Sequence, residues 1–415
     1  MYTTLNKQTS FFVALSLILV LFSTCKKDDG ECNTANVPTI QWQKTIGNND
    51  TVTIDDIQKT TDGGYILAGY KKNTQNDSDY WIAKLNSNAD IEWEKTYGGS
   101  NTDKATCIQQ TADGSYIVAG YSYSVNGNVT NNNGGSDAWI LKLSTNGDIE
   151  WQKTYGGSAD DYLNSIKQTT DGGYIAVGGS NSNNGDIPNN QGYTDAWIIK
   201  IDTNGNIEWS KTFGGNASDG LVDIQQTTNG GYLTVGVTQS TDGWGDYLVI
   251  NLQTNGNLEW QKTYGSIYTD IASCIQKTND GHYLLVGYSN SNDGTTINPN
   301  GNSDALLIKI DNLGNILQQT SVGTNDSEIA YNVLQTHDNI FLITGISQNT
   351  NSSIGNIFIA TLGTNCNLLW QRQIPQGVNN SYAKAIFETP DCSYMLFGNQ
   401  FFDSFLGNNI IIKLK

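Results

Sequence analysis

The sequence predicts an all-β fold, a seven-bladed β-propeller in which every blade is a four-stranded antiparallel sheet. Three observations carry this prediction. Similar phrases recur seven times, each repeat unit holds four short runs of strand-forming residues, and the chain begins and ends inside a unit. Repetition at such a period is typical of solenoids, propellers and arrays, and the local pattern decides among them.

Three phrases define the repeat, which follows Pro38. They read Asn-Gly-Asn-Ile-Glu-Trp-Gln-Lys-Thr-Tyr-Gly-Gly, Thr-Asp-Gly-Gly-Tyr and Asp-Ala-Trp-Ile-Ile-Lys-Leu. The tryptophan of the first phrase stands at positions 42, 93, 151, 209, 260 and 370, and Gln318 replaces it once. Each phrase therefore marks seven units of similar length.

The second unit shows the expected strands most clearly, at residues 105–111, 116–121, 138–143 and 149–155. These runs are rich in Ile, Val, Tyr, Trp and Thr, and no unit has a helical period. Asp113-Gly114 and Asn146-Gly147 join the runs in pairs, and such dipeptides favour two-residue hairpins because both positions accept positive φ. We name the four strands A, B, C and D in chain order, with A nearest the axis of the ring.

The two ends of the repeat region predict a closed ring. Residues 40–45 form a D strand that no A, B or C strand precedes, and residues 410–414 form a C strand that no D strand follows. The first strand is expected to complete the last blade, which removes two open sheet edges.

The first 38 residues read as an export and anchoring signal. Lys7 precedes an apolar run at 11–22, which is short for a membrane span and suits a signal peptide of residues 1–24. Ser23-Thr24-Cys25 resembles a bacterial lipobox, with Phe22 in place of the usual Leu, and a plain secretory peptide is the alternative. Lipidated Cys25 and a charged, flexible tether over 25–38 would then hold the propeller, residues 39–415, at the outer membrane, exposed on the cell surface.

Composition excludes some partners. The 415 residues carry a formal net charge of -18, and Arg372 is the one arginine. Such a chain cannot neutralise a run of phosphates, so nucleic acid is not expected as a partner.

An acidic residue recurs six positions after the Tyr position of the first phrase, where the chain enters the innermost strand. These residues are Asp103, Asp161, Asp219, Asp270 and Glu328, and Val52 and Asn380 occupy the position in the other two units. Crowded carboxylates near the channel mouth would repel each other and could be relieved by Ca²⁺, which prefers oxygen ligands. The alternative is that each carboxylate accepts backbone N–H groups in its own crossover turn.

The B–C loops are the expected binding surface. Three of them, at 126–137, 184–195 and 293–304, carry an Asn- and Gly-rich insertion that is either a Ca²⁺ loop or an ordinary surface loop. Aromatic residues that do not belong to the repeat fall in these loops. They are Tyr193, Trp244, Phe401, Phe402 and Phe405, which would stack on sugar rings or fold back over the blade edges.

The cysteines indicate little function. Cys107 and Cys274 occupy equivalent A-strand positions about three blades apart and cannot pair, whereas Cys366 and Cys392 lie in turns of neighbouring blades, where a disulfide is an open possibility.

The repeat phrases, over residues 40–415, resemble a group of secreted bacterial lipoproteins with quinoprotein-like or kelch-like propellers, for which the resemblance implies a fold but no activity. The residues of a quinone cofactor site are not matched. Thr60-x-Asp62-x-Gly64 is similar to part of the sialidase Asp-box, but Ile66 replaces its Thr, and one arginine cannot supply the arginine cluster of a sialidase.

Three functions stay open at this point. The first is a surface lipoprotein whose propeller binds a glycan or protein on the B–C loop face without catalysis. The second is a glycoside-active enzyme that uses carboxylates at the channel mouth, and the third is a purely structural or adhesion protein.

Overall fold

The computed structural model describes residues 37–47, 52–73, 77–239, 244–265, 268–290, 302–349, 354–377, 380–403 and 406–415. The chain divides into a unit Met1–Thr34 and a unit Ala35–Lys415, and the second is the propeller. The expected signal peptide, Cys25, residues 25–36 of the tether and Phe405 lie outside the described residues. Among the described residues, no helix is long and apolar enough to cross a membrane.

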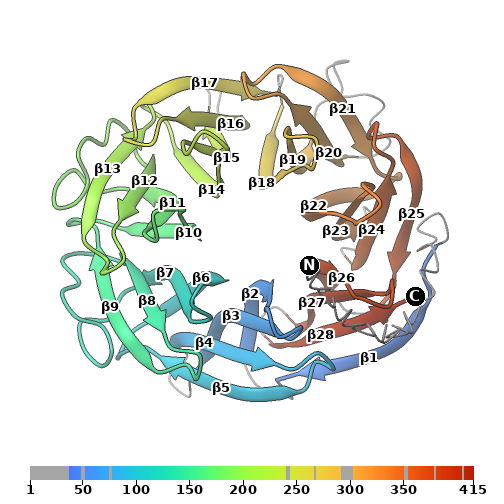
Figure 1. The fold of residues 1–415 in the computed structure, drawn as a ribbon, viewed down its shortest axis with the longest axis horizontal. Coiled ribbons are helices and arrows are strands. Elements are labelled where there is room, and N and C mark those ends of the chain that lie inside the picture. Colours follow the sequence, from blue (N-terminus) through green and yellow to red (C-terminus); the bar gives the residue numbers. More distant parts are fainter. Residues whose placement is uncertain are drawn as a thin grey trace, which may run out of the picture. The chain divides into compact units, whose positions relative to one another are not determined.

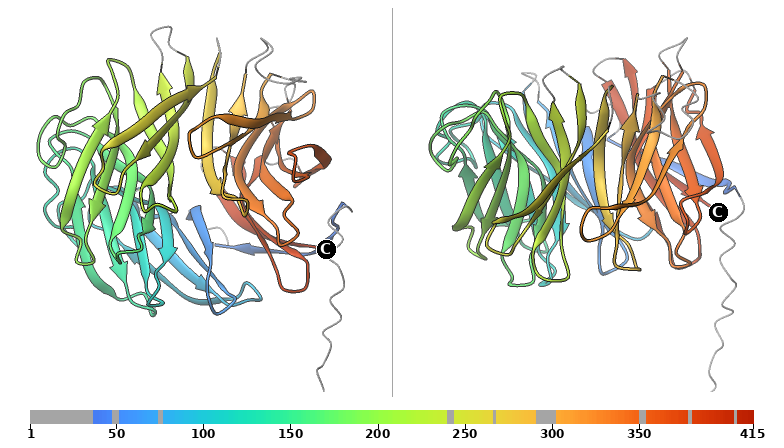
Figure 2. Two further views of the ribbon diagram at one scale, coloured as in Figure 1. Left: turned by 45° about the horizontal axis from the view of Figure 1, so that its top comes forward. Right: turned by 90° about the horizontal axis from the view of Figure 1, so that it is seen from above.

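Seven four-stranded antiparallel sheets surround a central channel, which confirms the predicted fold (Figure 1). The strands of every blade run between the two faces of the ring (Figure 2). We call the face with the B–C loops and the D–A crossovers the loop face, and the face with the A–B and C–D turns the turn face. In the second unit the strands match the predicted ranges to within two residues.

The strands follow the same order in every blade. The inner A strands are β2 (Val52–Lys59), β6 (Asp103–Gln110), β10 (Asp161–Gln168), β14 (Asp219–Gln226), β18 (Asp270–Lys277), β22 (Ser327–Gln335) and β26 (Asn380–Glu388). The B strands are β3 (Tyr65–Lys72), β7 (Tyr116–Ser122), β11 (Tyr174–Ser180), β15 (Tyr232–Gln239), β19 (Tyr283–Ser289), β23 (Phe341–Gln348) and β27 (Tyr394–Asp403). The C strands are β4 (Ser78–Leu85), β8 (Asp137–Leu143), β12 (Asp195–Ile201), β16 (Gly245–Leu252), β20 (Asp304–Ile310), β24 (Gly355–Leu362) and β28 (Leu406–Leu414). The outer D strands are β5 (Ile91–Tyr97), β9 (Ile149–Tyr155), β13 (Ile207–Phe213), β17 (Leu258–Tyr264), β21 (Ile316–Val322), β25 (Leu368–Ile374) and β1 (Ile40–Ile46).

Closure of the ring occurs as predicted. Strand β1 pairs antiparallel with β28, with Thr45 opposite Ile410 and Lys44 opposite Ile411. In Figure 1 the blue β1 therefore lies along the red β28 and completes the last blade as its outer strand. Backbone hydrogen bonds between Thr39 and Lys415, at 2.7 and 2.9 Å, extend this pairing to the last residue.

The hairpins differ from the prediction in one respect. In the A–B turn of the third blade, Gly172 donates to the carbonyl of Thr169 at 2.9 Å, and of the loop residues only Gly172 has a positive φ, of 88°. The connection is thus a three-residue loop with one left-handed residue, and not the expected two-residue turn. Asp171 accepts the Thr169 hydroxyl and the Gly173 N–H at 2.5 and 2.9 Å, and these bonds explain why Thr-x-Asp-Gly-Gly recurs.

The core lies between neighbouring blades. The C-strand tryptophans Trp139 and Trp197 are fully buried, and Trp197 packs in a cluster with Ile140 and Tyr155 of the preceding blade. The D-strand tryptophans are half-buried. The ring of Trp93, for example, packs closely on Gly147 of the next blade, where a Cβ atom would lie only 2.9 Å from the ring. Burial of these large side chains between blades stabilises the ring as a whole.

Candidate functional site

Each of the seven inner strands contains a β-bulge at the same position. In each case one residue of the inner strand has no opposite residue on the partner strand. These bulged residues are Asp55, Thr106, Asn164, Val222, Ser273, Tyr331 and Lys384. All seven line a cavity of about 370 Å³ in the channel. A bulge aims an extra side chain away from the regular ladder, so this ring of bulges builds the wall of the cavity.

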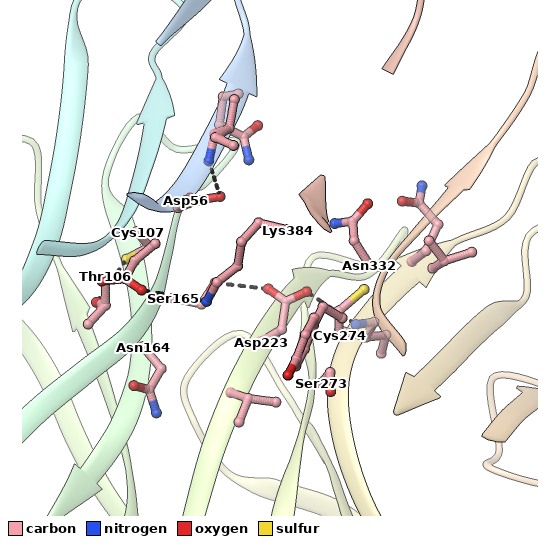
Figure 3. A pocket seen from close by; sticks show the side chains of 18 of the residues that line it. Asp56, Thr106, Cys107, Asn164, Ser165, Asp223, Ser273, Cys274, Asn332 and Lys384 are labelled. Atoms are coloured by element: carbon pink, nitrogen blue, oxygen red, sulfur yellow. Dashed lines mark hydrogen bonds and ion pairs between the residues drawn. The ribbon is translucent and has the colours of Figure 1, made fainter. Parts of the chain in front are cut away.

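Two further carboxylates, Asp56 and Asp223, line the cavity, and Figure 3 shows them together with Lys384. Asp56 accepts the N–H of Ile57 on its own strand at 2.7 Å and the N–H of Ile108 on the next blade at 2.9 Å. Asp223, three blades away, accepts the N–H of Ile224 at 2.9 Å and that of Ile275 on the next blade at 3.2 Å. Both carboxylates therefore join neighbouring inner strands.

Lys167 is the cation between these two carboxylates. Its Nζ lies 3.9 Å from Asp223 Oδ1. Burial acts to lower the pKa of Lys167, but the charges of Asp223 and Asp56 outweigh burial and raise that pKa. Burial also raises the pKa of Asp56 to about 6, because water is excluded from its ionised form and Lys167 compensates only in part.

Asp55, Tyr331 and Lys384 line the loop-face end of the cavity, and with the adjacent Tyr382 they form what we call the channel mouth. Lys384 Nζ lies 3.5 Å from Asp55 Oδ1, and 5.8 and 5.7 Å from the ring centroids of Tyr331 and Tyr382. The two tyrosine rings meet edge to face at 5.5 Å. Asn399 fixes Tyr382 by donating to its hydroxyl at 2.9 Å, so the mouth is pre-organised by its own contacts.

The predicted loop aromatics have different environments. Tyr193 is 80% exposed in a B–C loop, and Trp244 is 46% exposed with its ring 6.0 Å from that of Tyr268. Phe401 stacks on Tyr382 at 5.8 Å and therefore adjoins the channel mouth. Phe402 belongs to β27, but its side chain, like the whole of Phe405, lies outside the described part of the structure.

The five predicted acidic residues begin the inner strands, as expected, but none of them lines the cavity. Asp161 illustrates their surroundings. It is fully buried and accepts the N–H of Gly157 and the hydroxyl of Ser182, both at 2.7 Å, as well as the hydroxyl of Ser180. Equivalent bonds to crossover N–H groups are made by Asp103, Asp219 and Glu328. This arrangement matches the alternative to a Ca²⁺ site, in which each carboxylate accepts backbone N–H groups of its own crossover turn.

A second carboxylate, which the sequence reasoning did not pair with the first, lies at each of these blade junctions. A Cβ on Gly156 would lie 2.7 Å from Asp137 Oδ1 and 2.6 Å from Asp161 Oδ2, so the glycine makes room for both carboxylates. The five pairs are Asp79–Asp103, Asp137–Asp161, Asp195–Asp219, Asp246–Asp270 and Asp304–Glu328, around Gly98, Gly156, Gly214, Gly265 and Gly323. At the other two junctions both acids are missing.

The strand register corrects one assignment. Ser381, and not Asn380, occupies the position equivalent to Asp161, because Ser381 faces Gln400 as Asp161 faces Ser180. Among the described residues, no group of three or more His, Cys, Asp or Glu side chains is arranged to hold a metal ion. Ca²⁺ binding by the predicted acidic residues stays a prediction.

The predicted loop insertions fold onto their neighbours. In the loop at 126–137, Asn128 donates its N–H to the carbonyl of Gly98 at 2.9 Å, and Val129 is buried. The loop at 184–195 repeats this arrangement with Asp186 and Ile187, and most of the loop at 293–304 lies outside the described residues. The two described loops thus form a packed rim on the loop face.

Cys107, Cys274 and Cys366 are free thiols. Burial raises the pKa of Cys107 and of Cys274 to about 12, so these channel thiols are unreactive. Cys392 is in a disulfide, but not with Cys366, so the pairing left open by the sequence does not form. Both residues have a positive φ, of 55° and 57°, at turn positions that most of the other blades fill with glycine.

The sequence contains a signal for the cavity that the motif search missed. At the bulge the seven inner strands carry seven different residues, and at the position after it they carry Asp twice, Cys twice and three other residues, whereas the residue that follows is Ile in six strands and Val in one. Asp55-Asp56, Val222-Asp223 and Lys384-Ala385 are three versions of the same two positions. Variation at a fixed point of an otherwise regular repeat therefore identifies the channel wall.

The sequence matches no protein-family model and no curated protein. Similar solved structures include Sqt1 from Chaetomium thermophilum, at 10% identity, with 91% of this chain and 99% of that chain covered and a TM-score of 0.49. The propeller domain of the Trilobed protease from Pyrococcus furiosus matches at 10% identity, with 88% and 94% covered and a TM-score of 0.47. Trypanosoma rangeli sialidase with the inhibitor DANA matches at 10% identity, with 79% and 57% covered and a TM-score of 0.39.

Proposed function

We propose that this protein is a lipid-anchored, surface-exposed propeller of the outer membrane that binds a glycan or protein ligand on its loop face without catalysis. The proposal includes a signal peptide at 1–24, lipidation of Cys25, a tether over 25–38 and membership of the bacterial repeat group that the sequence resembles. The proposed tether directly precedes β1 in the sequence, and β1 is the strand that closes the ring.

One observation carries the binding function. The scaffold positions of the seven blades repeat, whereas the side chains that the bulges aim into the channel do not. Structural needs are the same in every blade and select the same residue, so irregular residues on a regular scaffold indicate contact with something asymmetric. Aromatic residues continue this surface outward, since Phe401 stacks on Tyr382 at 5.8 Å.

Catalysis has less support. A general acid or base needs an oxygen that can reach the substrate. The predicted carboxylates are buried in the blade junctions, and both oxygens of Asp56 and of Asp223 accept backbone N–H groups. These acids are engaged in joining strands, which favours a binding module over the glycoside-active enzyme.

Binding and hydrolysis can be measured on the same preparation. The full chain, solubilised in detergent, is screened on a glycan array and against surface proteins of the same cells, and each bound saccharide is then incubated with it and analysed for cleavage. We expect saturable binding without product. Cleavage products would establish the enzyme instead, and the absence of any ligand would leave the structural or adhesion protein.

A further inference from the structure

The channel mouth has the properties of a ligand site in its own right. Its cavity of about 370 Å³ is of the size that proteins use for small ligands. Tyr331, Asp55 and Lys384 line this cavity and are each partly exposed, and Tyr382, which is also partly exposed, lies beside it against Tyr331 and Lys384. The inference developed here rests on the proposed binding function and identifies its ligand.

Charge balance indicates a neutral ligand. Three carboxylates, Asp55, Asp56 and Asp223, and two ammonium groups, Lys167 and Lys384, line the cavity, and Lys104, outside the lining, supplies the third positive charge by its interaction with Asp55. The chain outside the channel is strongly acidic, with a net charge of -18. A balanced site in an acidic protein offers no surplus cation to an anionic ligand, and its paired charges give little to a cationic one.

The backbone of the inner strands is not available for a peptide strand. Edge N–H and C=O groups of a sheet can bind an extended peptide by strand addition. Here neighbouring blades occupy those groups, because Asp56 and Asp223 take N–H groups, Thr106 donates to the carbonyl of Leu163 at 2.6 Å, and Asn164 donates to that of Leu221 at 2.8 Å. These four bonds oppose strand addition on β6, β10, β14 and β18, so recognition along these strands uses side chains.

The side chains that remain combine ring faces with hydrogen-bonding groups. The rings of Tyr331 and Tyr382 both lie near Lys384, with centroids 5.8 and 5.7 Å from its Nζ, and a third ring, Tyr70, lies 4.5 Å from Lys104 Nζ. Aromatic faces pack against the C–H faces of a sugar ring, while an ammonium and a carboxylate bond its hydroxyl groups. Few other neutral metabolites present an apolar face and a hydroxyl-rich edge together.

We propose that the channel mouth binds a neutral saccharide of mono- or disaccharide size, stacked on Tyr331 and Tyr382 and hydrogen-bonded by Lys384 and Asp55. The site accepts the end of a glycan from the loop face, where the exposed aromatic residues of the B–C loops lie further out. Lys384 orients the sugar and does not neutralise it, since Asp55 already balances the lysine charge.

Calorimetry on the full chain in detergent tests the proposal, with cellobiose, maltose, mannobiose and xylobiose as neutral probes and digalacturonate as the charged one. We expect a neutral probe to bind, and Tyr331→Ala and Lys384→Met each to weaken it by at least about tenfold. Leu313→Ala is the control, because this side chain is 67% exposed in a C–D turn on the turn face, and it should change affinity by less than about twofold.

The contradicting results are distinct. Preference for digalacturonate would show that the ligand is charged and not neutral. A neutral probe whose binding is lost in Tyr193→Ala but kept in Tyr331→Ala would place the site on the loops. A protein ligand without any saccharide binding would refute this inference and leave the proposed binding function intact. Should Tyr331→Ala fail to fold, nitration of the wild type decides, since the bound probe must protect Tyr331 and Tyr382.

Discussion

Replacing Asp137 by asparagine should stabilise the protein, although the residue is fully buried and recurs in five blades. Asp137 Oδ2 accepts the N–H of Asn133 at 2.8 Å, whereas Oδ1 is buried without a hydrogen-bond partner and faces Asp161 across Gly156. An asparagine can keep its carbonyl oxygen on Asn133 and turn its NH₂ group toward Asp161. The substitution therefore exchanges a repulsive contact for an attractive one.

The magnitude follows from the pKa of Asp137, which burial, followed by the charges of Asp161 and Asp186, raises from 3.8 to about 6. A folded-state pKa above the unfolded value means that the folded protein binds the proton more tightly. This stabilisation is complete below the unfolded pKa and is lost as the pH rises through about 6. A difference of about two pH units corresponds to about 3 kcal/mol, an upper figure for one junction.

Urea denaturation at several pH values tests this reasoning. At pH 8 we expect Asp137→Asn to raise the free energy of unfolding by about 1–3 kcal/mol, and at pH 4 to leave it unchanged or slightly lower. Asp148→Asn is the control, because its side chain is 76% exposed and belongs to another turn. Destabilisation by Asp137→Asn at pH 8, or an equal effect at both pH values, would refute the account of the junction.

Four further predictions concern stability and the anchor. Lys84 is buried and bonds two half-exposed carboxylates and the Leu85 carbonyl at 2.8 to 3.1 Å, so Lys84→Met should lower the free energy of unfolding by about 2 kcal/mol in urea at neutral pH. Gly156→Ala should cost about 1–3 kcal/mol by crowding both carboxylates, whereas Gly215→Ala, with open space around its Cβ, should cost under about 0.5 kcal/mol. Deleting residues 40–46 exposes the edge of β28 and should lower the melting temperature and cause aggregation in size-exclusion chromatography; unchanged behaviour would contradict closure. Cys25→Ala should release the protein from sedimented membranes, and continued sedimentation would remove the lipid anchor from the proposal.

The architecture could be predicted from the sequence because every blade has the same four strands and packs against its neighbours in the same way. Strand-forming runs and turn residues recur in every unit, so the strands of an irregular unit can be assigned by comparison with the other units. The split final blade then indicates closure of the ring. Turn geometry was less accessible, since Asp-Gly and Asn-Gly are compatible with both two-residue and three-residue connections. The structure shows that only the glycine of the pair, such as Gly172, is left-handed.

The candidate site was harder to predict because it depends on contacts between blades. The sequence placed Asp161 at the start of an inner strand but could not reveal that Asp137, from the preceding C strand, faces it. Nor could it reveal that each inner strand is bulged, which decides that Asp55 and Lys384 line the cavity. The carboxylate pair forms between neighbouring sheets and the bulge forms between an inner strand and its partner in the same sheet, so periodicity within one strand carries no information about either.

The most direct test of the whole account is a crystal structure of the protein grown with the neutral saccharide that binds best. The account predicts a closed ring of seven blades, with β1 on β28 and the sugar ring between Tyr331 and Tyr382, within hydrogen-bonding distance of Lys384. A sugar seated beside Tyr193 on the outer loops, with the channel mouth holding only solvent, would contradict it.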